Sequence, residues 1–277
     1  MNAFVENLTD DEIKDLKQSE DVAVVEPDYV FHAHAVEVQQ NAPWNLVHLS
    51  KDFPSRTEIR DFSYDSNDGA GVTVYVLDSG VNPNAVNLRG RVELGANFIE
   101  DEGHEDLFGH GTEVATILAG DVYGVARAAR VVSVKVLDKE GFGSNSIVAE
   151  AVNWVLADHK SRVAGANGRF VKSIINLSLG GPKSEFANMA IQKAIDAGIQ
   201  VFTSSGNDYG DACEHSPASV PDAITVGAVD RNNRMSDFSN WGKCVDLLAP
   251  GQDVLTAGSE KMSTVSGTRY FFPSFLI

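Results

Sequence analysis

An aspartate and a histidine in this sequence have the surroundings expected of an acid–base pair. Asp78 ends an apolar run that reads Val-Leu-Asp-Ser-Gly, and His110 stands between two glycines at the start of an apolar helical pattern. Alone, a strand-end aspartate is usually a turn cap, and such a histidine can be a simple polar end residue. Together they indicate more, because a carboxylate that orients an imidazole is useful mainly where the imidazole is general base to a nucleophile.

A third candidate is Asn207, in the turn Ser-Ser-Gly-Asn-Asp that follows another apolar run. An asparagine in a turn is usually structural, since it tolerates left-handed backbone. In acyl transfer, however, an asparagine amide aimed at the developing oxyanion stabilises the transition state. The three residues therefore suggest acyl transfer, and the segment Val-Ser-Gly-Thr at 265–268 should introduce the nucleophile.

The elements that must position these residues follow from the apolar pattern. Runs rich in β-branched residues alternate with helical patterns, which is typical of βαβ units and a parallel sheet. The predicted strands cover residues 72–77, 131–136, 173–177, 199–202 and 223–226. Helices are predicted over 144–164 and 184–197, with Gly198 in place to end the second. In such folds, sites lie at the carboxyl ends of strands, where Asp78 and Asn207 stand.

The N-terminal region differs from the rest in charge and pattern. Residues 1 to 38 hold ten acids and two lysines, so they carry -8 of the total formal charge of -17. Thr9 and Glu12 predict a capping box at the start of a short helix, residues 22–25 predict a strand, and residues 32–41 a linker. We therefore expect a separate segment over residues 1–40 and a main domain over residues 41–277.

The overall charge and apolar pattern exclude several classes of function. With 22 Lys and Arg against 39 Asp and Glu, the chain is unsuited to neutralise phosphates or to bind an anionic bilayer. No glycine fingerprint for a dinucleotide or a P-loop follows a strand. We expect neither nucleic acid nor membrane as a partner. No signal-peptide pattern follows Met1 in the chain as written.

Taken as a set, the motifs resemble those of the subtilisin-like serine proteases, peptidase family S8, and within them the proteinase K and aqualysin branch. Besides the motifs of Asp78, His110 and Asn207, the matching segments are 176–181, 216–218, 226–228, 238–242, 249–251 and 266–268. The resemblance implies a three-layer α/β fold with a mostly parallel central sheet flanked by helices. It also implies that residues 1–40 are part of an inhibitory propeptide of α+β structure.

The resemblance further implies a serine endopeptidase that hydrolyses peptide bonds through an Asp-His-Ser triad. Asp78 would orient His110, His110 would be the general base, and Asn207 would be the oxyanion donor. The substrates would be polypeptides, bound in extended form between Gly141-Phe142-Gly143 and Ser178-Leu179-Gly180. Apolar residues around Phe142 would receive the substrate's side chains.

Features that stabilise or regulate the family are also implied. Cys213 and Cys244 match one disulfide of the aqualysin type, with two free thiols as the alternative. Asp246, with main-chain oxygens of Pro221 and Ala223, matches a calcium site of the proteinase K type, although an exposed loop aspartate is an ordinary alternative. No cofactor beyond structural Ca²⁺ is expected. The family also implies a monomer, inhibited by its own propeptide and secreted or vacuolar.

The end of the chain departs from the family pattern. The family continues Gly-Thr-Ser-Met-Ala, with the serine as nucleophile, whereas this chain has Arg269 directly after Gly267-Thr268. A guanidinium cannot attack a carbonyl at neutral pH, so we expect the chain as written to be inactive. By the same comparison, we expect it to be truncated at both ends, with the C-terminal part of the fold missing. A catalytically dead homologue that binds extended peptides or a protein partner is the alternative function.

Two smaller questions concern residues close to His110. Glu113 and Thr116 replace the histidine and glycine that are usual in the family, and neither change removes a catalytic group. His104 and His110, with nearby acids, could form a transition-metal cluster, but we favour an acidic, solvated loop. The acids concerned are Glu102, Glu105 and Asp106.

Overall fold

The computed structural model describes residues 5–27, 36–50, 60–166, 168, 170–258 and 261–268. The chain divides into two compact units, Met1–Ala35 and Val36–Ile277. Within the described residues, no helix is both long enough and apolar enough to cross a membrane.

The first unit contains the helix α1 (Asp10–Gln18). Its predicted capping box is confirmed: Thr9 N donates to Glu12 Oε2 at 2.7 Å, and Glu12 N donates to Thr9 Oγ1 at 3.4 Å. The helix buries none of its residues. The strand predicted over residues 22–25 is wrong, since these residues are described and form no strand. A strand needs a paired neighbour for its main-chain groups, and none pairs with it among the described residues.

The second unit is built on a seven-stranded sheet with the order β11-β10-β8-β6-β3-β5-β4. All its neighbouring strands run parallel. The strands are β3 (Val72–Asp78), β4 (Val92–Asn97), β5 (Arg130–Lys135), β6 (Lys172–Leu177), β8 (Gln200–Ser204), β10 (Ile224–Val229) and β11 (Leu247–Pro250). The five predicted strands are confirmed, while β4 and β11, which carry fewer β-branched residues and form the two sheet edges, were not predicted.

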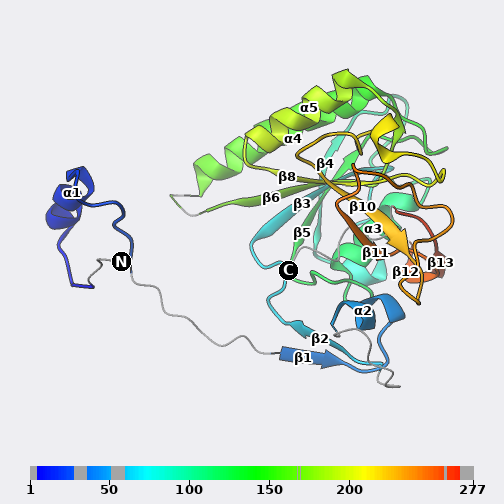
Figure 1. Ribbon diagram of the computed structural model, residues 1–277, viewed down its shortest axis with the longest axis horizontal. Coiled ribbons are helices and arrows are strands. Elements are labelled where there is room, and N and C mark those ends of the chain that lie inside the picture. Colours follow the sequence, from blue (N-terminus) through cyan, green and yellow to red (C-terminus); the bar gives the residue numbers. More distant parts are fainter. Residues whose placement is uncertain are drawn as a thin grey trace. The chain divides into compact units, whose positions relative to one another are not determined.

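Helices cover both faces of this sheet (Figure 1). Along β3, Val74 and Val76 join an apolar cluster with α3 (His110–Ala119). Tyr75 and Leu77 point to the other face, into a cluster with α4 (Asn145–Gly165) and α5 (Glu185–Asp196). Because successive side chains of a strand point to opposite faces, a strand buried on both sides is apolar throughout. The three-layer α/β architecture is therefore confirmed.

The predicted ends of α4 and α5 are also confirmed. Ile147 N donates to Ser144 Oγ at 3.2 Å, and Ala187 N donates to Ser184 Oγ at 3.3 Å, so each serine is an N-cap. After α5, Gly198 has a φ of +85°, the left-handed conformation that ends many helices.

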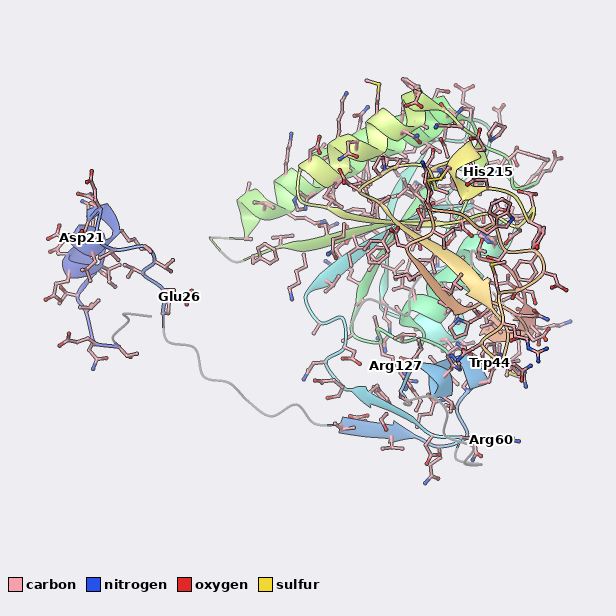
Figure 2. The ribbon with its side chains drawn as sticks, viewed as in Figure 1. Asp21, Glu26, Trp44, Arg60, Arg127 and His215 are labelled. Atoms are coloured by element: carbon pink, nitrogen blue, oxygen red, sulfur yellow. A yellow bond between two sulfur atoms is a disulfide. The ribbon has the colours of Figure 1, made fainter. Side chains whose placement is uncertain are left out.

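A smaller sheet lies beside the main one and corrects the expected linker. In it β1 (Val36–Gln39) pairs antiparallel with β2 (Phe62–Asp65). Residues 36–39 therefore belong to the second unit, whereas residues 32–35 of the expected linker lie outside the described residues. Arg127, labelled in Figure 2, stacks on Tyr64 with its guanidinium carbon 4.1 Å from the ring centre, and it also hydrogen bonds Gln39.

The remaining short elements lie in the second unit. They are α2 (Trp44–Leu49), β7 (Gly181–Pro182), β9 (His215–Ser216), β12 (Val254–Ala257), β13 (Met262–Val265) and the 3₁₀ turns Val86–Leu88 and Ala212–Glu214. Two further antiparallel pairs, β7 with β9 and β12 with β13, form among them.

A polar network ties α4 to the sheet. The buried Tyr75 hydroxyl donates to Asp158 Oδ2 at 2.7 Å, and Arg162 Nε donates to the same oxygen at 2.6 Å. Arg162 also donates to Glu93 Oε1 of β4 at 3.0 Å. Burial and the Asp158 carboxylate raise the pKa of Tyr75 well above its ordinary value. Burial lowers the pKa of Arg162, but hydrogen bonds to Asp158 and Glu93 outweigh that effect and raise it.

Replacing Asp158 with alanine should therefore lower the free energy of unfolding by about 1 to 3 kcal/mol, because the buried Tyr75 hydroxyl loses its acceptor. Urea denaturation followed by circular dichroism would measure the change. Glu150→Ala, at an exposed site on the same helix, is the control and should change stability little. Equal effects of the two substitutions would contradict the role given to the network.

Candidate active site

The sheet order brings the predicted site segments to one edge. Asp78 is the last residue of β3, and β5 and β6 are the two neighbours of β3. Residues 141–143 follow β5 in the chain, residues 178–180 follow β6, and Asn207 follows β8, the next strand along. Because parallel strands end at the same edge, these segments meet around the end of β3.

The acid–base pair is formed. His110 Nδ1 lies 2.7 Å from Asp78 Oδ1, and the residues are 5% and 0% exposed. Asp78 Oδ1 also accepts a hydrogen bond from Ser79 N at 2.8 Å, which fixes the carboxylate. A carboxylate against Nδ1 leaves Nε2 as the nitrogen that can take up a proton in general-base chemistry.

Asp106, which sequence reasoning placed in a solvated acidic loop, instead organises the start of α3. Its Oδ1 accepts from Gly109 N and from Ser79 Oγ, both at 2.7 Å. Its Oδ2 accepts from Thr112 N at 2.8 Å and from Thr112 Oγ1 at 2.5 Å. A carboxylate here satisfies N–H groups that the first helical turn leaves unpaired, and its charge complements the helix dipole. The aspartate just before a helix start was the signal that could have predicted this.

A buried lysine holds Ser79, the residue that follows Asp78. Lys135 is fully buried, and its Nζ donates to Ser79 O at 2.7 Å and to Leu137 O at 3.0 Å. Its charge is paired with Glu102 Oε2 at 3.1 Å. The hydrogen bond from Lys139 N, aided by Lys135, lowers the pKa of Glu102. Among the described residues, no group of three or more His, Cys, Asp or Glu side chains is arranged to hold a metal ion.

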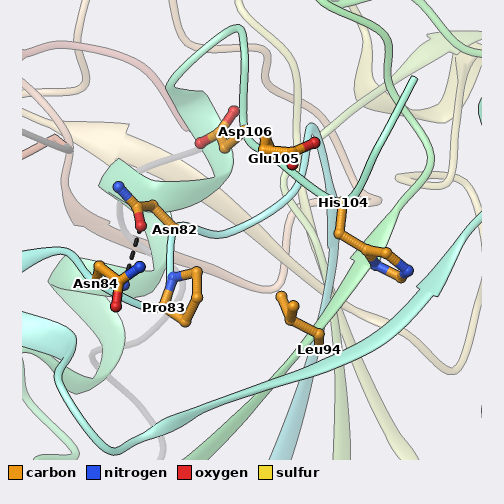
Figure 3. Close-up of a pocket in the computed structure, with 7 residues that line it drawn as sticks. All are labelled: Asn82, Pro83, Asn84, Leu94, His104, Glu105 and Asp106. Carbon is orange, nitrogen blue, oxygen red and sulfur yellow. Dashed lines mark hydrogen bonds between the residues drawn. The ribbon is translucent and has the colours of Figure 1, made fainter.

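A hollow of about 270 Å³ opens beside the start of α3 (Figure 3). Asn82, Leu94, His104 and Asp106 are among its lining residues. None of Asp78, His110 and Asn207 lines it. The hollow is therefore separate from the predicted catalytic groups.

The amide of Asn207 is held in one orientation. Its Oδ1 accepts from Thr268 N at 2.9 Å and from Thr268 Oγ1 at 3.0 Å. Because the oxygen is engaged in this way, the Nδ2 group is the part of the amide that can donate to another molecule. Arg269, the next residue after Thr268, lies outside the described residues.

Asn240, which lies in the matching segment 238–242 but had no predicted role, shapes the turn that carries Asn207. Its Nδ2 donates to Ser205 O at 2.9 Å, and its Oδ1 accepts from Asp208 N and Gly210 N, both at 2.9 Å. At Gly206, where φ is +105°, a Cβ would lie 2.2 Å from Asn240 Nδ2, so only glycine fits.

The segments that carry Asn207 and Asn240 are also joined covalently. Cys213 and Cys244 form a disulfide, as the resemblance implies, and the described residues contain no free cysteine. Trp241 Nε1 donates to Tyr209 O at 3.0 Å between the same two segments. The alternative of two free thiols is therefore not what the structure contains.

The expected substrate segment 141–143 forms a projecting turn. Asp138 Oδ1 accepts from Phe142 N at 2.9 Å and from Glu140 N at 2.8 Å, and these main-chain hydrogen bonds lower the pKa of Asp138. The Phe142 side chain is 70% exposed. At Gly141 a Cβ would lie 2.8 Å from the ring of Phe108, so glycine allows that close approach.

The second expected segment, 178–180, leads from β6 into β7. Ser178 is buried, and its Oγ accepts from Asn176 Nδ2 at 3.0 Å. Leu179 O accepts from Ser204 Oγ at 3.4 Å, while Gly180 is exposed. The two segments thus flank the strand that ends in Asp78, one on each side.

Comparison with known proteins agrees with the resemblance found in the sequence motifs. The sequence profile of the Subtilase family, peptidase S8, matches residues 69–272. "Subtilisin-like protease 3" of Pseudogymnoascus destructans is 41% identical over 266 residues, which are 95% of this chain and 65% of that protein. "Alkaline protease 1" of Aspergillus oryzae is 38% identical over 274 residues, 98% of this chain and 66% of that protein. The chain thus spans just under two thirds of the length of these relatives.

A solved structure supports the same relationship. The crystal structure of a cold-adapted subtilisin-like serine proteinase superposes with a TM-score of 0.76 and 37% sequence identity, over 85% of this chain and 82% of that one. The shared fold and the profile match over most of the chain show that this protein belongs to the Subtilase family, peptidase S8.

Proposed function

We propose that this protein is by family a serine-type endopeptidase, with Asp78 to orient His110, His110 as the general base and Asn207 as the oxyanion donor, and that the chain as written is inactive. The observation that carries this proposal is the buried contact of 2.7 Å between Asp78 Oδ1 and His110 Nδ1. Such a pair provides acid–base catalysis to a serine nucleophile, and a preorganised amide such as that of Asn207 stabilises the negative charge that develops.

In the printed chain, Arg269 occupies the place of the nucleophilic serine, as judged from the family pattern. As the alternative function, we propose that this chain is a catalytically dead homologue that binds extended peptides or a protein partner. Residues 141–143 and 178–180 would offer main-chain pairing to such a peptide, and Phe142 would contact its apolar side chains. Without a nucleophile, only the effects of binding and of the oxyanion donor remain.

We also propose a branch within the family, a cellular location, an oligomeric state and a role for the N-terminal segment. The Cys213–Cys244 disulfide supports membership of the proteinase K and aqualysin branch and a secreted or vacuolar location, because disulfides persist in oxidising compartments. We propose a monomer in which the N-terminal segment acts as an intramolecular inhibitor. The pairing of β1 with β2 within the second unit supports ending this segment before Val36.

Structural Ca²⁺ is the cofactor that the family implies. Asp246 fits such a site, because its carboxylate is exposed and, among the residues that the structure describes, only Oδ2 is held, by Thr225 N at 2.7 Å. Ala223, which precedes Thr225 by two residues, and Pro221 would supply main-chain oxygens. Carboxylate and carbonyl oxygens are the ligands that Ca²⁺ prefers.

A fluorophosphonate probe, which labels activated serines, tests the catalytic proposal. The unmodified chain should show no labelling. Arg269→Ser should be labelled, and adding His110→Ala to that variant should abolish the label. Circular dichroism would verify that the variants fold like the unmodified chain. Serine labelling of the unmodified chain, or no labelling of a folded Arg269→Ser variant, would contradict the proposal.

Peptide binding tests the role of the exposed ring at residue 142. Phe142→Ala should weaken the binding of a fluorescein-labelled alanine hexapeptide with a central leucine by about tenfold, because apolar contact area is lost. Fluorescence anisotropy would measure the Kd. Phe170→Ala is a matched control: Phe170 is 85% exposed and precedes β6, at the opposite edge of the sheet. Equal Kd values for the two variants would refute this role of Phe142.

Thermal unfolding with and without calcium tests the proposed ion site. A ligand at about 100 times its Kd stabilises the folded state by about 2.7 kcal/mol, so Ca²⁺ should raise the Tm by several degrees. The rise should be absent in Asp246→Asn and absent when Mg²⁺ replaces Ca²⁺. A Tm that does not respond to Ca²⁺, or that responds equally in Asp246→Asn, would rule out the site.

A further inference from the structure

Glu113 and Thr116 depart from the family pattern, and no catalytic role requires them. Both lie on α3, the helix that begins with His110. All residues of this helix are buried except Glu113, which is half-buried. A carboxylate at the edge of a buried helix calls for a polar partner, and its partners lie on the β12–β13 hairpin, far away in the sequence.

The hydrogen bonds between α3 and the hairpin come from both of its strands. Ser263 Oγ of β13 donates to Glu113 Oε1 at 2.7 Å, and Thr256 Oγ1 of β12 donates to Glu113 O at 3.0 Å. Thr256 and Ser263 face each other directly across the hairpin. One turn further along the helix, Thr116 Oγ1 lies 2.9 Å from Ala257 O and 2.8 Å from Thr112 O, so its single proton is shared between the hairpin and its own helix. Three contacts therefore hold the hairpin on the helix.

The hairpin leads directly to the turn that holds the oxyanion asparagine. After β13, Ser266 Oγ accepts from Asp253 N at 2.9 Å, and Gly267 N donates to Gly251 O at 2.8 Å. Thr268, fully buried, then donates its N–H and hydroxyl to Asn207 Oδ1. The same three-residue turn is therefore tied to α3 through the hairpin and to Asn207 directly.

We infer that Glu113 and Thr116 are positioning residues that fix the turn 266–268, and through it Asn207, relative to the helix of His110. They touch no reacting atom themselves. A charge-assisted hydrogen bond, from Ser263 to Glu113, is stronger and more directional than a neutral one, so it resists sliding of the hairpin along the helix. The inference rests on the proposed roles of His110 and Asn207.

Amide exchange in the ¹⁵N-labelled full chain tests this inference without any peptide or probe. Ser263→Ala should speed exchange at Thr268 N–H by about tenfold or more, the effect expected from losing a hydrogen bond to a charged group, and should shift the Asn207 side-chain amide resonance. Exchange along β3 should stay unchanged. Ser263→Thr keeps the hydroxyl and should behave like the original chain.

Thr256→Val provides a second, shape-conserving variant that removes only the bond to Glu113 O, and it should change the same two signals. Unchanged signals at Thr268 and Asn207 in both variants would overturn the inference. So would equal acceleration of every amide, since that would show a contribution to global stability alone. Failure of the catalytic proposal would appear separately, in fluorophosphonate labelling.

Discussion

The parallel pairing of β3 with β5 and β6 is the constraint on which the rest of the site depends. Parallel strands end together, so the aspartate that closes β3 lies between the segments that follow its two neighbours. The register sets Lys135 of β5 directly opposite Asp78. A shift of β3 by one residue would turn the Asp78 side chain to the other face of the sheet, where α3 and its histidine would be out of reach.

Burial of charge around Asp78 is compensated mainly at one carboxylate oxygen, Oδ1. A buried carboxylate is costly unless hydrogen bonds replace its hydration, and Asp78 receives them from Ser79 N and from the imidazole of His110. Ser79 is itself held by Asp106 and, through its carbonyl, by Lys135. These linked contacts leave the acid–base pair little freedom to reorganise, which is the condition for electrostatic preorganisation.

The site is composed of two halves that different parts of the chain support. One half is His110 on α3 with Asp78 on β3. The other is the turn of Asn207, which Asn240 and the disulfide shape from the segment 238–244. The β12–β13 hairpin contacts the first half through Glu113 and the second through Thr268. The hairpin therefore links the two halves of the site.

The sequence by itself determined the local elements and the residue types of the site. β-Branched runs predicted β3, β5, β6, β8 and β10, helical patterns predicted α4 and α5, and the motifs around them pointed to Asp78, His110 and Asn207. The signal for each strand, helix or motif lies within a short stretch of chain, so periodicity and local motif rules read it directly.

Only the tertiary structure decided which segments pair and which side chains support the site. It showed no strand at residues 22–25, made residues 36–39 a strand by pairing them with β2, and gave Asp106 and Asn240 their supporting roles. The partners of Glu113 lie 143 and 150 residues away in the chain. Such contacts arise when the packed sheet brings distant segments together, and local sequence periodicity carries no information about them.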